Sequence, residues 1–132
     1  MTTTEPILVT ITQGPLDGPA PCSGGDVECG AWVVFEGLVR ETEDGKRIRA
    51  LNYTTYEPMA QNMLAEIASA VLDKYHLLRV LVEHSRGQVP VGRCSFRLCI
   101  GAPHRKEALA AMDEFIDRMK QDVPIWKSPE WA

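Results

Sequence analysis

The sequence lacks any apolar run of about 18 residues, so it predicts no membrane-spanning helix and no membrane partner. Residues 1–6 contain neither the basic nor the apolar stretch of a secretory signal, and the expected compartment is therefore the cytoplasm. Basic residues are not in excess. The formal net charge of -4 at pH 7 argues against non-specific binding to nucleic acid.

Motifs of several large protein classes are also missing. The four cysteines form no CxxC pair and have no histidine nearby at zinc-finger spacing, so we expect neither a zinc site nor a functional cysteine. There is no GxSxG, Walker or GxGxxG motif and no cluster of carboxylates that could bind a metal. These absences exclude most nucleotide-binding and hydrolase functions, and we expect no metal and no cofactor.

The residues that are present suit one globular domain. Of the 132 residues, 45% are hydrophobic and 24% are charged, and we expect a single domain over residues 1–132. The patterning predicts an α+β fold in the order β-β-β-α-β-β-α, with strands at 7–12, 31–39, 48–56, 77–84 and 93–101 and helices at 59–75 and 106–121. We expect a loop over 14–30, a hairpin at Asp44-Gly45, a turn over 87–92 and an extended tail from Val123.

Two stretches predict which side chains face the core. In the last strand, alternation places four residues inward (Cys94, Phe96, Leu98, Ile100) and three outward (Ser95, Arg97, Cys99). In the second helix, spacings of three and four residues predict one buried stripe: Ala108, Leu109, Met112, Phe115, Ile116 and Met119.

Cationic residues at three places could bind an anion or act in catalysis. His104 and Arg105 lie where a strand leads into a helix, and the N–H groups of a helix N-terminus favour anions. Arg40 ends a strand and could hold an anionic ligand by a bidentate contact. Each also has a simpler explanation, since His104 and Arg105 could be solvated loop residues and Arg40 could pair with a neighbouring glutamate. His84 ends a strand, where a structural role is the more usual one.

Two lysines follow in the last fifth of the chain. Lys120 lies at the end of the second helix, and Lys127 follows Ile125-Trp126. A lysine held beside these apolar residues is partly desolvated and can act as a nucleophile or as a general acid and base. The alternative roles are complementing the helix dipole for Lys120 and solvation in the tail for Lys127.

Four segments, in this order, resemble the large, catalytic subunit of molybdopterin synthase, of the MoaE type. They contain Gly30-Ala31 with Phe35-Glu36-Gly37 and Arg40, then Tyr53 with Tyr56-Glu57 and Met59-Ala60, then Gly101-Ala102-Pro103-His104-Arg105, and finally Val123-Pro124-Ile125-Trp126-Lys127. The resemblance covers about residues 7–127. It implies an α/β-hammerhead-type fold with antiparallel sheets, and a homodimer that binds a small ubiquitin-like subunit at each end to form a heterotetramer.

The resemblance also implies a reaction. A thiocarboxylate at the Gly-Gly terminus of the small sulfur-carrier subunit supplies two sulfurs to cyclic pyranopterin monophosphate, which becomes the dithiolene molybdopterin. Lys120 and Lys127 match the two catalytic lysines of the family. The substrate-binding residues by the same matching are Arg40, His104, Arg105, Phe35 and Met119, with the His-Arg pair supplied from across the dimer.

Departures from the family pattern leave two other classes of function open. Lys127 is followed by Ser128-Pro129 instead of a basic residue, and no basic residue of a longer tail follows Ala132, so Arg86 could compensate in holding phosphate. One alternative is a homologue that docks the small subunit without catalysis. The other is an unrelated acyl- or phosphoryl-transfer enzyme that uses the same histidine and lysines without any ubiquitin-like partner.

Overall fold

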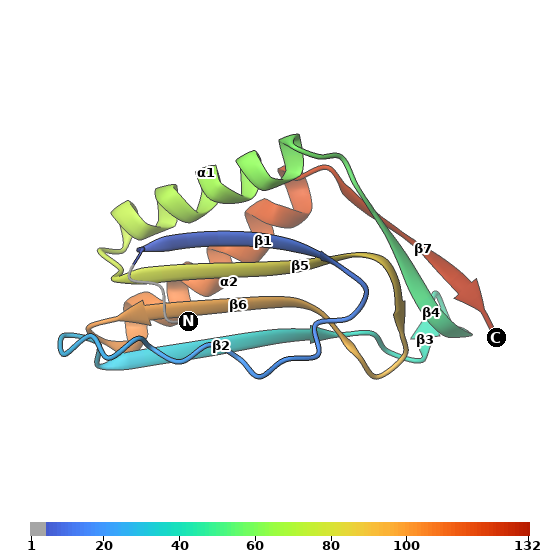
Figure 1. Cartoon of the computed structure of the whole chain (residues 1–132), viewed down its shortest axis with the longest axis horizontal. Coiled ribbons are helices and arrows are strands. Elements are labelled where there is room, and N and C mark those ends of the chain that lie inside the picture. The colour runs from blue at the N-terminus through green and yellow to red at the C-terminus, as the bar shows by residue number, and fades with distance from the viewer. Residues whose placement is uncertain (1–4) are drawn as a thin grey trace.

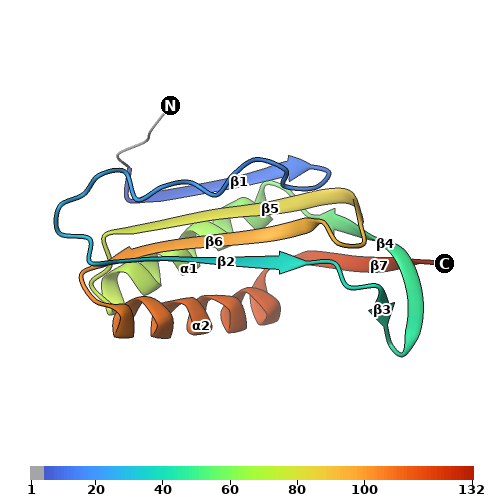
Figure 2. The same ribbon diagram turned by 90° about the horizontal axis from the view of Figure 1, so that it is seen from below.

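In the computed structural model, which describes residues 5–132, two helices cover one face of a seven-stranded sheet (Figures 1 and 2). This arrangement confirms the α+β prediction. The elements are β1 (Ile7–Gln13), β2 (Ala31–Leu38), β3 (Thr42–Glu43), β4 (Lys46–Thr55), α1 (Met59–Lys74), β5 (Arg79–Pro90), β6 (Cys94–Ala102), α2 (Arg105–Asp122) and β7 (Ile125–Trp131). The strands β3 and β7 are additions to the predicted order.

Antiparallel pairs make up most of the sheet. The strands run in the order β2-β6-β5-β4-β3, with β1 beside β5 and β7 beside β4, and only the β1–β5 pair among the described strands is parallel. Figure 1 shows β4 and β7 together at the right-hand end of the molecule, whereas both helices extend to the left. The predicted hairpin is present, because β3 and β4 pair across Asp44-Gly45.

The predicted turn over residues 87–92 is shorter than expected, because β5 bends at Gly87 and continues to Pro90, and the turn itself occupies residues 91–93. Gly87 has a φ of +79°, and β5 continues through it so that Val89 pairs with Leu51 of β4. A Cβ on Gly87 would lie 2.1 Å from the side chain of Gln13, so glycine fits both the backbone and the space. Upstream of the bend, β5 pairs with β1 and β6, so this one strand joins both parts of the sheet.

The main core lies between the helices and the sheet. Apolar side chains of α1 and α2 with no exposed surface, such as Leu64, Val71 and Phe115, pack against Leu98 and Ile100 of β6. The helical periodicity is therefore confirmed for most of the predicted stripe on α2. Leu109 is an exception, since it is 52% exposed and lies at the margin of the stripe, away from the sheet.

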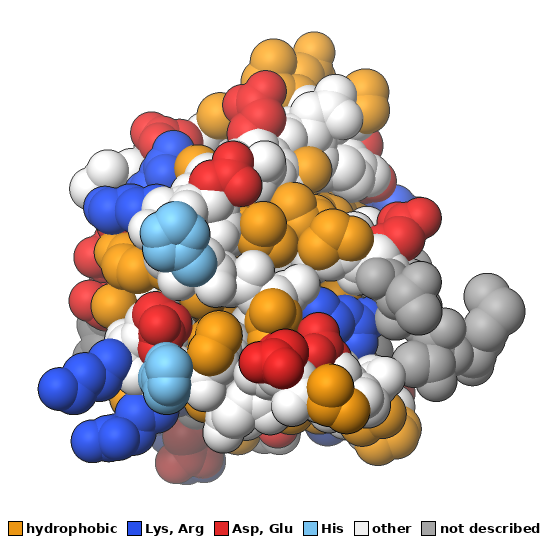
Figure 3. Space-filling view, turned by 90° about the vertical axis from the view of Figure 1, so that its left-hand side faces the viewer, with side chains coloured by type: hydrophobic (Ala, Val, Ile, Leu, Met, Phe, Trp, Pro, Cys, Tyr) orange, Lys and Arg blue, Asp and Glu red, His pale blue; other side chains and the backbone are white. Residues whose placement is uncertain are grey.

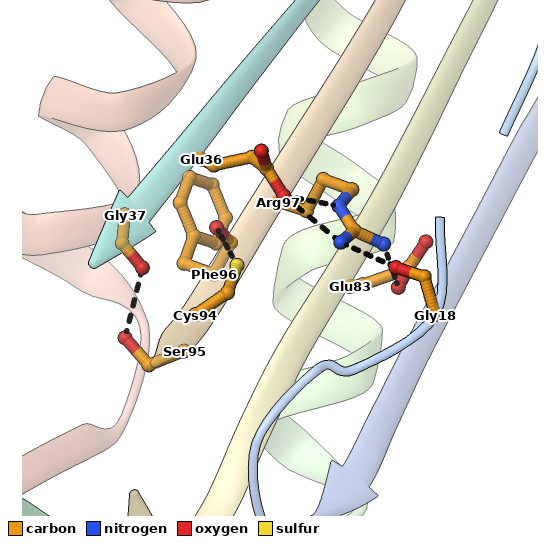
Figure 4. Close-up of polar contacts among 8 residues, drawn as sticks. All are labelled: Gly18, Glu36, Gly37, Glu83, Cys94, Ser95, Phe96 and Arg97. Carbon is orange, nitrogen blue, oxygen red and sulfur yellow. Dashed lines mark hydrogen bonds and ion pairs between the residues drawn. The ribbon is translucent and has the colours of Figure 1, made fainter. Parts of the chain in front are cut away.

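The opposite face of the sheet is buried as well, which corrects the outward placement predicted for Ser95, Arg97 and Cys99. These three residues are 5%, 4% and 1% exposed. The connection over residues 14–30 contacts Arg97, whereas Ser95 lies against Tyr53 and Gly37. The Arg97 guanidinium donates hydrogen bonds to Glu36, to Glu83 and to the carbonyl oxygen of Gly18 in this connection (Figure 4). Burial raises the pKa of the Cys99 thiol to about 11, so the group stays protonated and unreactive.

Replacing Arg97 with alanine is expected to lower the free energy of unfolding by about 2–3 kcal/mol, because two carboxylates and a carbonyl lose their partner. Arg93 offers a matched control, since its ion pair with Asp17 involves the same connection but is exposed. Arg93→Ala should cost less than about 1 kcal/mol. Chemical denaturation of both variants measures the difference, and equal losses would contradict an anchoring role for Arg97.

The tail is extended, as predicted, and forms a strand. From Ile125 to Trp131 it pairs with β4 as an edge strand, and an edge strand tolerates the proline at position 129. Within the described part of the chain, neither helix has the length and hydropathy needed to cross a bilayer.

Candidate functional site

A cavity of about 440 Å³ opens at the end of the molecule where β2, β4 and β7 meet the C-terminal end of α2. The local sequence explains how the elements meet there. Helix α2 ends at Asp122, and Pro124 cannot continue it, so the chain turns at once into β7. Pairing of β7 with β4 then places Lys127 opposite Tyr53. Residues from the C-terminal quarter of the chain thus reach those of its first half.

Five of the seven predicted site residues line this cavity. Lys120 and Met119 come from the last turn of α2, Lys127 comes from β7, and Phe35 and Arg40 come from β2 and the residues just after it. Phe35 and Arg40 are distant in the sequence from Met119, Lys120 and Lys127, and the fold brings both groups to one place. Their roles stay a prediction, since location alone does not show what a side chain binds.

His104 and Arg105 do not line the cavity. They lie at the opposite end of α2, and a rise of about 1.5 Å per residue puts Arg105 roughly 22 Å along the helix from Lys120. Both side chains are exposed, and the Nδ1 atom of His104 lies 3.5 Å from a carboxylate oxygen of Glu107. Figure 3 views that end of the molecule, where histidine and basic side chains stand out from the surface. Within one chain, this pair cannot act together with the lysines.

The charged groups around the cavity are three cations and one carboxylate. Arg40, Lys120 and Lys127 line it together with Glu43, whose carboxylate lies 3.4 Å from the Lys127 ammonium. This balance favours an anionic ligand. Among residues 5–132, no group of three His, Cys, Asp or Glu side chains lies together as a metal site requires.

The partial desolvation predicted for Lys127 is not present in the single chain. The Lys127 side chain is 53% exposed, and Lys120 is also exposed. The reason is that Trp126, which was expected to cover Lys127, is itself 59% exposed. Desolvation of these lysines therefore requires another molecule to close over the cavity.

The inner wall of the cavity contains further residues, to which the sequence assigned no role in the site. The hydroxyl groups of Tyr53 and Ser95 lie 2.9 Å apart, and Ser95 also faces the carbonyl oxygen of Gly37 at 3.5 Å (Figure 4). His84 lies against Tyr53 with the rings edge to face. These residues come from four strands, so the only signal in the sequence was their position near strand ends. That signal does not predict which strands pair.

His84 is a buried imidazole in this wall, 5% exposed. Burial lowers its pKa, although a hydrogen bond to the carbonyl oxygen of Ser85 acts in the opposite direction. The neutral ring therefore dominates in the folded protein at neutral pH.

The lowered pKa of His84 predicts a pH dependence of stability. Below an unfolded-state pKa of about 6.5, the unfolded chain gains a proton that the folded chain takes up only at lower pH, so stability falls as the pH falls through this window. His84→Asn should lack this part of the decrease. Denaturation at several pH values between 8 and 5 should show the stability difference between wild type and variant changing below about pH 6.5. A constant difference would contradict the assignment.

Arg86 is held outside the cavity. Its guanidinium lies 2.9 Å and 3.0 Å from the two carboxylate oxygens of Glu57. Hydrogen bonds from Thr55, Gln61 and Arg86 hold the pKa of Glu57 below its usual range, so the carboxylate keeps its charge. The suggestion that Arg86 compensates in holding phosphate thus finds no support in its position, because it does not line the cavity.

Proteins of known sequence resemble this chain over most of its length. A catalytic subunit of molybdopterin synthase from Nostoc is 42% identical over 103 residues, which cover 77% of this chain and 62% of that protein. The corresponding subunit from Bacillus subtilis is 40% identical over 79% of this chain and 66% of that protein. The chain thus spans somewhat less than two thirds of the length of these curated relatives.

Solved structures share the fold. Molybdopterin synthase from Staphylococcus aureus superposes with a TM-score of 0.76 at 34% identity, covering 81% of this chain and 78% of that chain. A complex of subunits 1 and 2 of the molybdopterin-converting factor from Helicobacter pylori superposes with a TM-score of 0.72 at 27% identity, covering 94% of this chain and 89% of that chain. The family model described as MoaE protein matches residues 11–122. By sequence and by fold, the chain belongs to the MoaE protein family.

Proposed function

We propose that this chain is the catalytic subunit of a molybdopterin synthase. In this function it transfers sulfur from a thiocarboxylated small subunit to cyclic pyranopterin monophosphate and forms the dithiolene of molybdopterin. The observation that carries the proposal is the convergence of Lys120, Lys127 and Arg40 on one cavity of about 440 Å³. Relatives with about 40% identity bear the name of this subunit.

The residue types around the cavity suit the chemistry. The substrate carries a cyclic phosphate, and the Arg40 guanidinium can hold it by charge-assisted hydrogen bonds. Phe35 and Met119 provide apolar surface for the pterin ring. Each thiocarboxylate sulfur forms a bond to a side-chain carbon of the pterin and displaces the oxygen on that carbon. One oxygen leaves as water, and the other stays on the opened phosphate, which remains on the product as a monoester. Water then cleaves the resulting thioester. The tail leaves as a carboxylate, and the sulfur stays on the product.

The two lysines would act on the thiocarboxylate tail. An ammonium group can polarise the carbonyl that is attacked by water and can supply protons as sulfur is added. Lys127 and Lys120 come from different elements, so they can reach a tail from two sides. The ion pair with Glu43 keeps Lys127 oriented until the tail arrives.

A small ubiquitin-like subunit is the proposed partner. Large apolar side chains are exposed beside the cavity, with Leu38 at 58%, Trp126 at 59% and Phe35 at 38%. Such a patch around a concave site is typical of a docking surface. The docked partner would also supply the desolvation that the lysines lack in the single chain. A related protein from Helicobacter pylori forms a complex of its two subunits.

A homodimer, and with two small subunits a heterotetramer, would complete the site. Since His104 and Arg105 lie far from the lysines of their own chain, they can contribute only from a second copy. Two-fold symmetry would then give two identical sites, each built from both chains. We place this assembly in the cytoplasm, where no membrane or nucleic acid takes part.

Subunit complementation tests the shared site. We expect Lys120→Ala and Arg105→Ala each to be inactive alone. After the two variants are mixed and allowed to exchange subunits, about one quarter of wild-type activity should return, because half of the dimers contain one intact site. Lys120→Ala and Lys127→Ala form the control pair, because one chain supplies both lysines to each proposed site. These two variants should stay inactive on mixing. No recovery in the first pair, once exchange is shown, would contradict a shared site.

The function itself is tested by reconstitution. The protein is mixed with a thiocarboxylated small subunit and cyclic pyranopterin monophosphate, and the dithiolene product is assayed as its fluorescent oxidised derivative. We expect product only when both are present. A stable complex without product would identify a docking homologue instead, and turnover without the small subunit would identify an unrelated transferase.

A further inference from the structure

We propose that His84 recognises the pterin ring of the substrate, by accepting at its Nε2 atom a hydrogen bond from a ring N–H group. The inference rests on the proposed function and adds a substrate-recognition residue from the strand β5, deep in the cavity.

The tautomer of the imidazole follows from its single hydrogen bond. The Nδ1 atom of His84 lies 2.7 Å from the carbonyl oxygen of Ser85. A carbonyl oxygen can only accept a hydrogen bond, so Nδ1 carries the proton and donates it. In the neutral ring, Nε2 then has a free lone pair. Among residues 5–132, no group donates a hydrogen bond to this atom.

Neighbouring rings fix the orientation of the imidazole. The ring centroid of Tyr53 lies 5.3 Å away at an interplanar angle of 79°, and that of Phe96 lies 5.7 Å away at 49°. The side chain is only 5% exposed, yet it contributes to the lining of the cavity. The Nε2 atom is not one of the fully buried polar atoms of the described chain that lack a partner, so it stays accessible. A ligand in the cavity that donates a hydrogen bond can therefore reach it.

The shape and the chemistry of the wall favour a pterin ring over the glycine tail. Phe35, Phe96 and Tyr53 present aromatic surface, which suits a flat fused heterocycle. A reduced pterin also carries several N–H donors on its edge. A glycine tail has no ring to pack there, and its charged end is already matched by the lysines. Burial lowers the pKa of His84, which keeps the imidazole neutral and able to accept.

Two amide substitutions test the roles of the two nitrogen atoms of His84 independently. The amide of His84→Asn can take the place of Nδ1 and keep the bond to Ser85, but it leaves the Nε2 position empty. The amide of His84→Gln reaches the Nε2 position and can accept there, but it loses the bond to Ser85. In the complete synthase, we expect Asn to raise the KM for cyclic pyranopterin monophosphate about tenfold with kcat within about twofold. Gln should stay near wild type in both parameters.

A purely structural role predicts the reverse order, with Asn tolerated and Gln impaired, and that result would overturn the proposal. An unchanged KM in His84→Asn would overturn it as well. If His84→Asn raises only the KM for the small subunit, the residue recognises the tail and not the pterin. Direct titration of each variant with cyclic pyranopterin monophosphate provides a readout that does not need turnover. If wild type itself bound no pterin, the proposed function would fail, whereas equal binding by wild type and His84→Asn would defeat the inference alone.

Discussion

Replacement of Lys127 with alanine should lower the rate of dithiolene formation by a factor of about 10²–10⁴, which is the usual contribution of a positioned general acid or base. The expectation rests on the position of Lys127 on β7, beside the cavity and opposite Tyr53. The side chain is half exposed, so its removal should leave the fold intact. Single-turnover assays with saturating thiocarboxylated small subunit measure the chemical step separately from docking.

Lys127→Arg separates charge from proton transfer. Arginine keeps a positive charge that can pair with Glu43, but it does not release a proton near neutral pH. We therefore expect Lys127→Arg to bind the small subunit normally and to stay nearly as slow as the alanine variant. Lys74→Ala is the matched control, because Lys74 forms an ion pair with Glu114 and neither residue lines the cavity. Retention of more than about half of the activity in Lys127→Ala would exclude a role in the chemical step.

Phe115→Ala is expected to produce the largest loss of stability, about 3–5 kcal/mol. Phe115 has no exposed surface and lies in the middle of α2, against the sheet. Truncation removes the buried ring and leaves a cavity that the surrounding strands cannot fill by relaxing. Chemical denaturation at a fixed protein concentration measures the change, because dimerisation would make the midpoint depend on concentration.

Leu109→Ala on the same helix is the control for this prediction. Leu109 is 52% exposed, so its replacement should change the free energy of unfolding by about 0.5 kcal/mol or less in the isolated chain. A Phe115→Leu variant should lie between the two, since it keeps most of the apolar volume. Similar losses in the leucine and phenylalanine truncations would show that the core does not lie where the structure places it.

Local patterns in the sequence were sufficient for much of the fold. The period of apolar residues predicted both helices to within one or two residues, because each buries one face against the sheet. Strands were harder where the signal depended on another part of the chain. The burial of Arg97 depends on the connection that crosses it, and β7 is a strand only because β4 offers it a free edge. Neither fact is present in the local sequence.

The residues of the site also divide into those that the local sequence indicates and those that depend on strand pairing. Arg40, Lys120 and Lys127 could be selected because charged residues beside predicted strand and helix ends are conspicuous, and the resemblance grouped them. Ser95 could not be selected, Tyr53 belonged only to a segment that carries the resemblance, and His84 was only a weak candidate at a strand end. Their shared wall depends on the register of β4, β5 and β6, and on the bend at Gly87 that carries β5 from one part of the sheet to the other.

The length of α2 has a consequence for how this protein tolerates change. The helix presents Arg105 at its first turn and Lys120 at its last, and its rigid repeat fixes both the separation and the relative direction of the two ends. Substitutions on its exposed face leave that relation intact. A single inserted residue would rotate one end by about 100° against the other and would shift it by about 1.5 Å. Helix α2 should therefore accept many replacements but no insertion or deletion. The connections at its two ends can vary in length where their residues do not line the cavity.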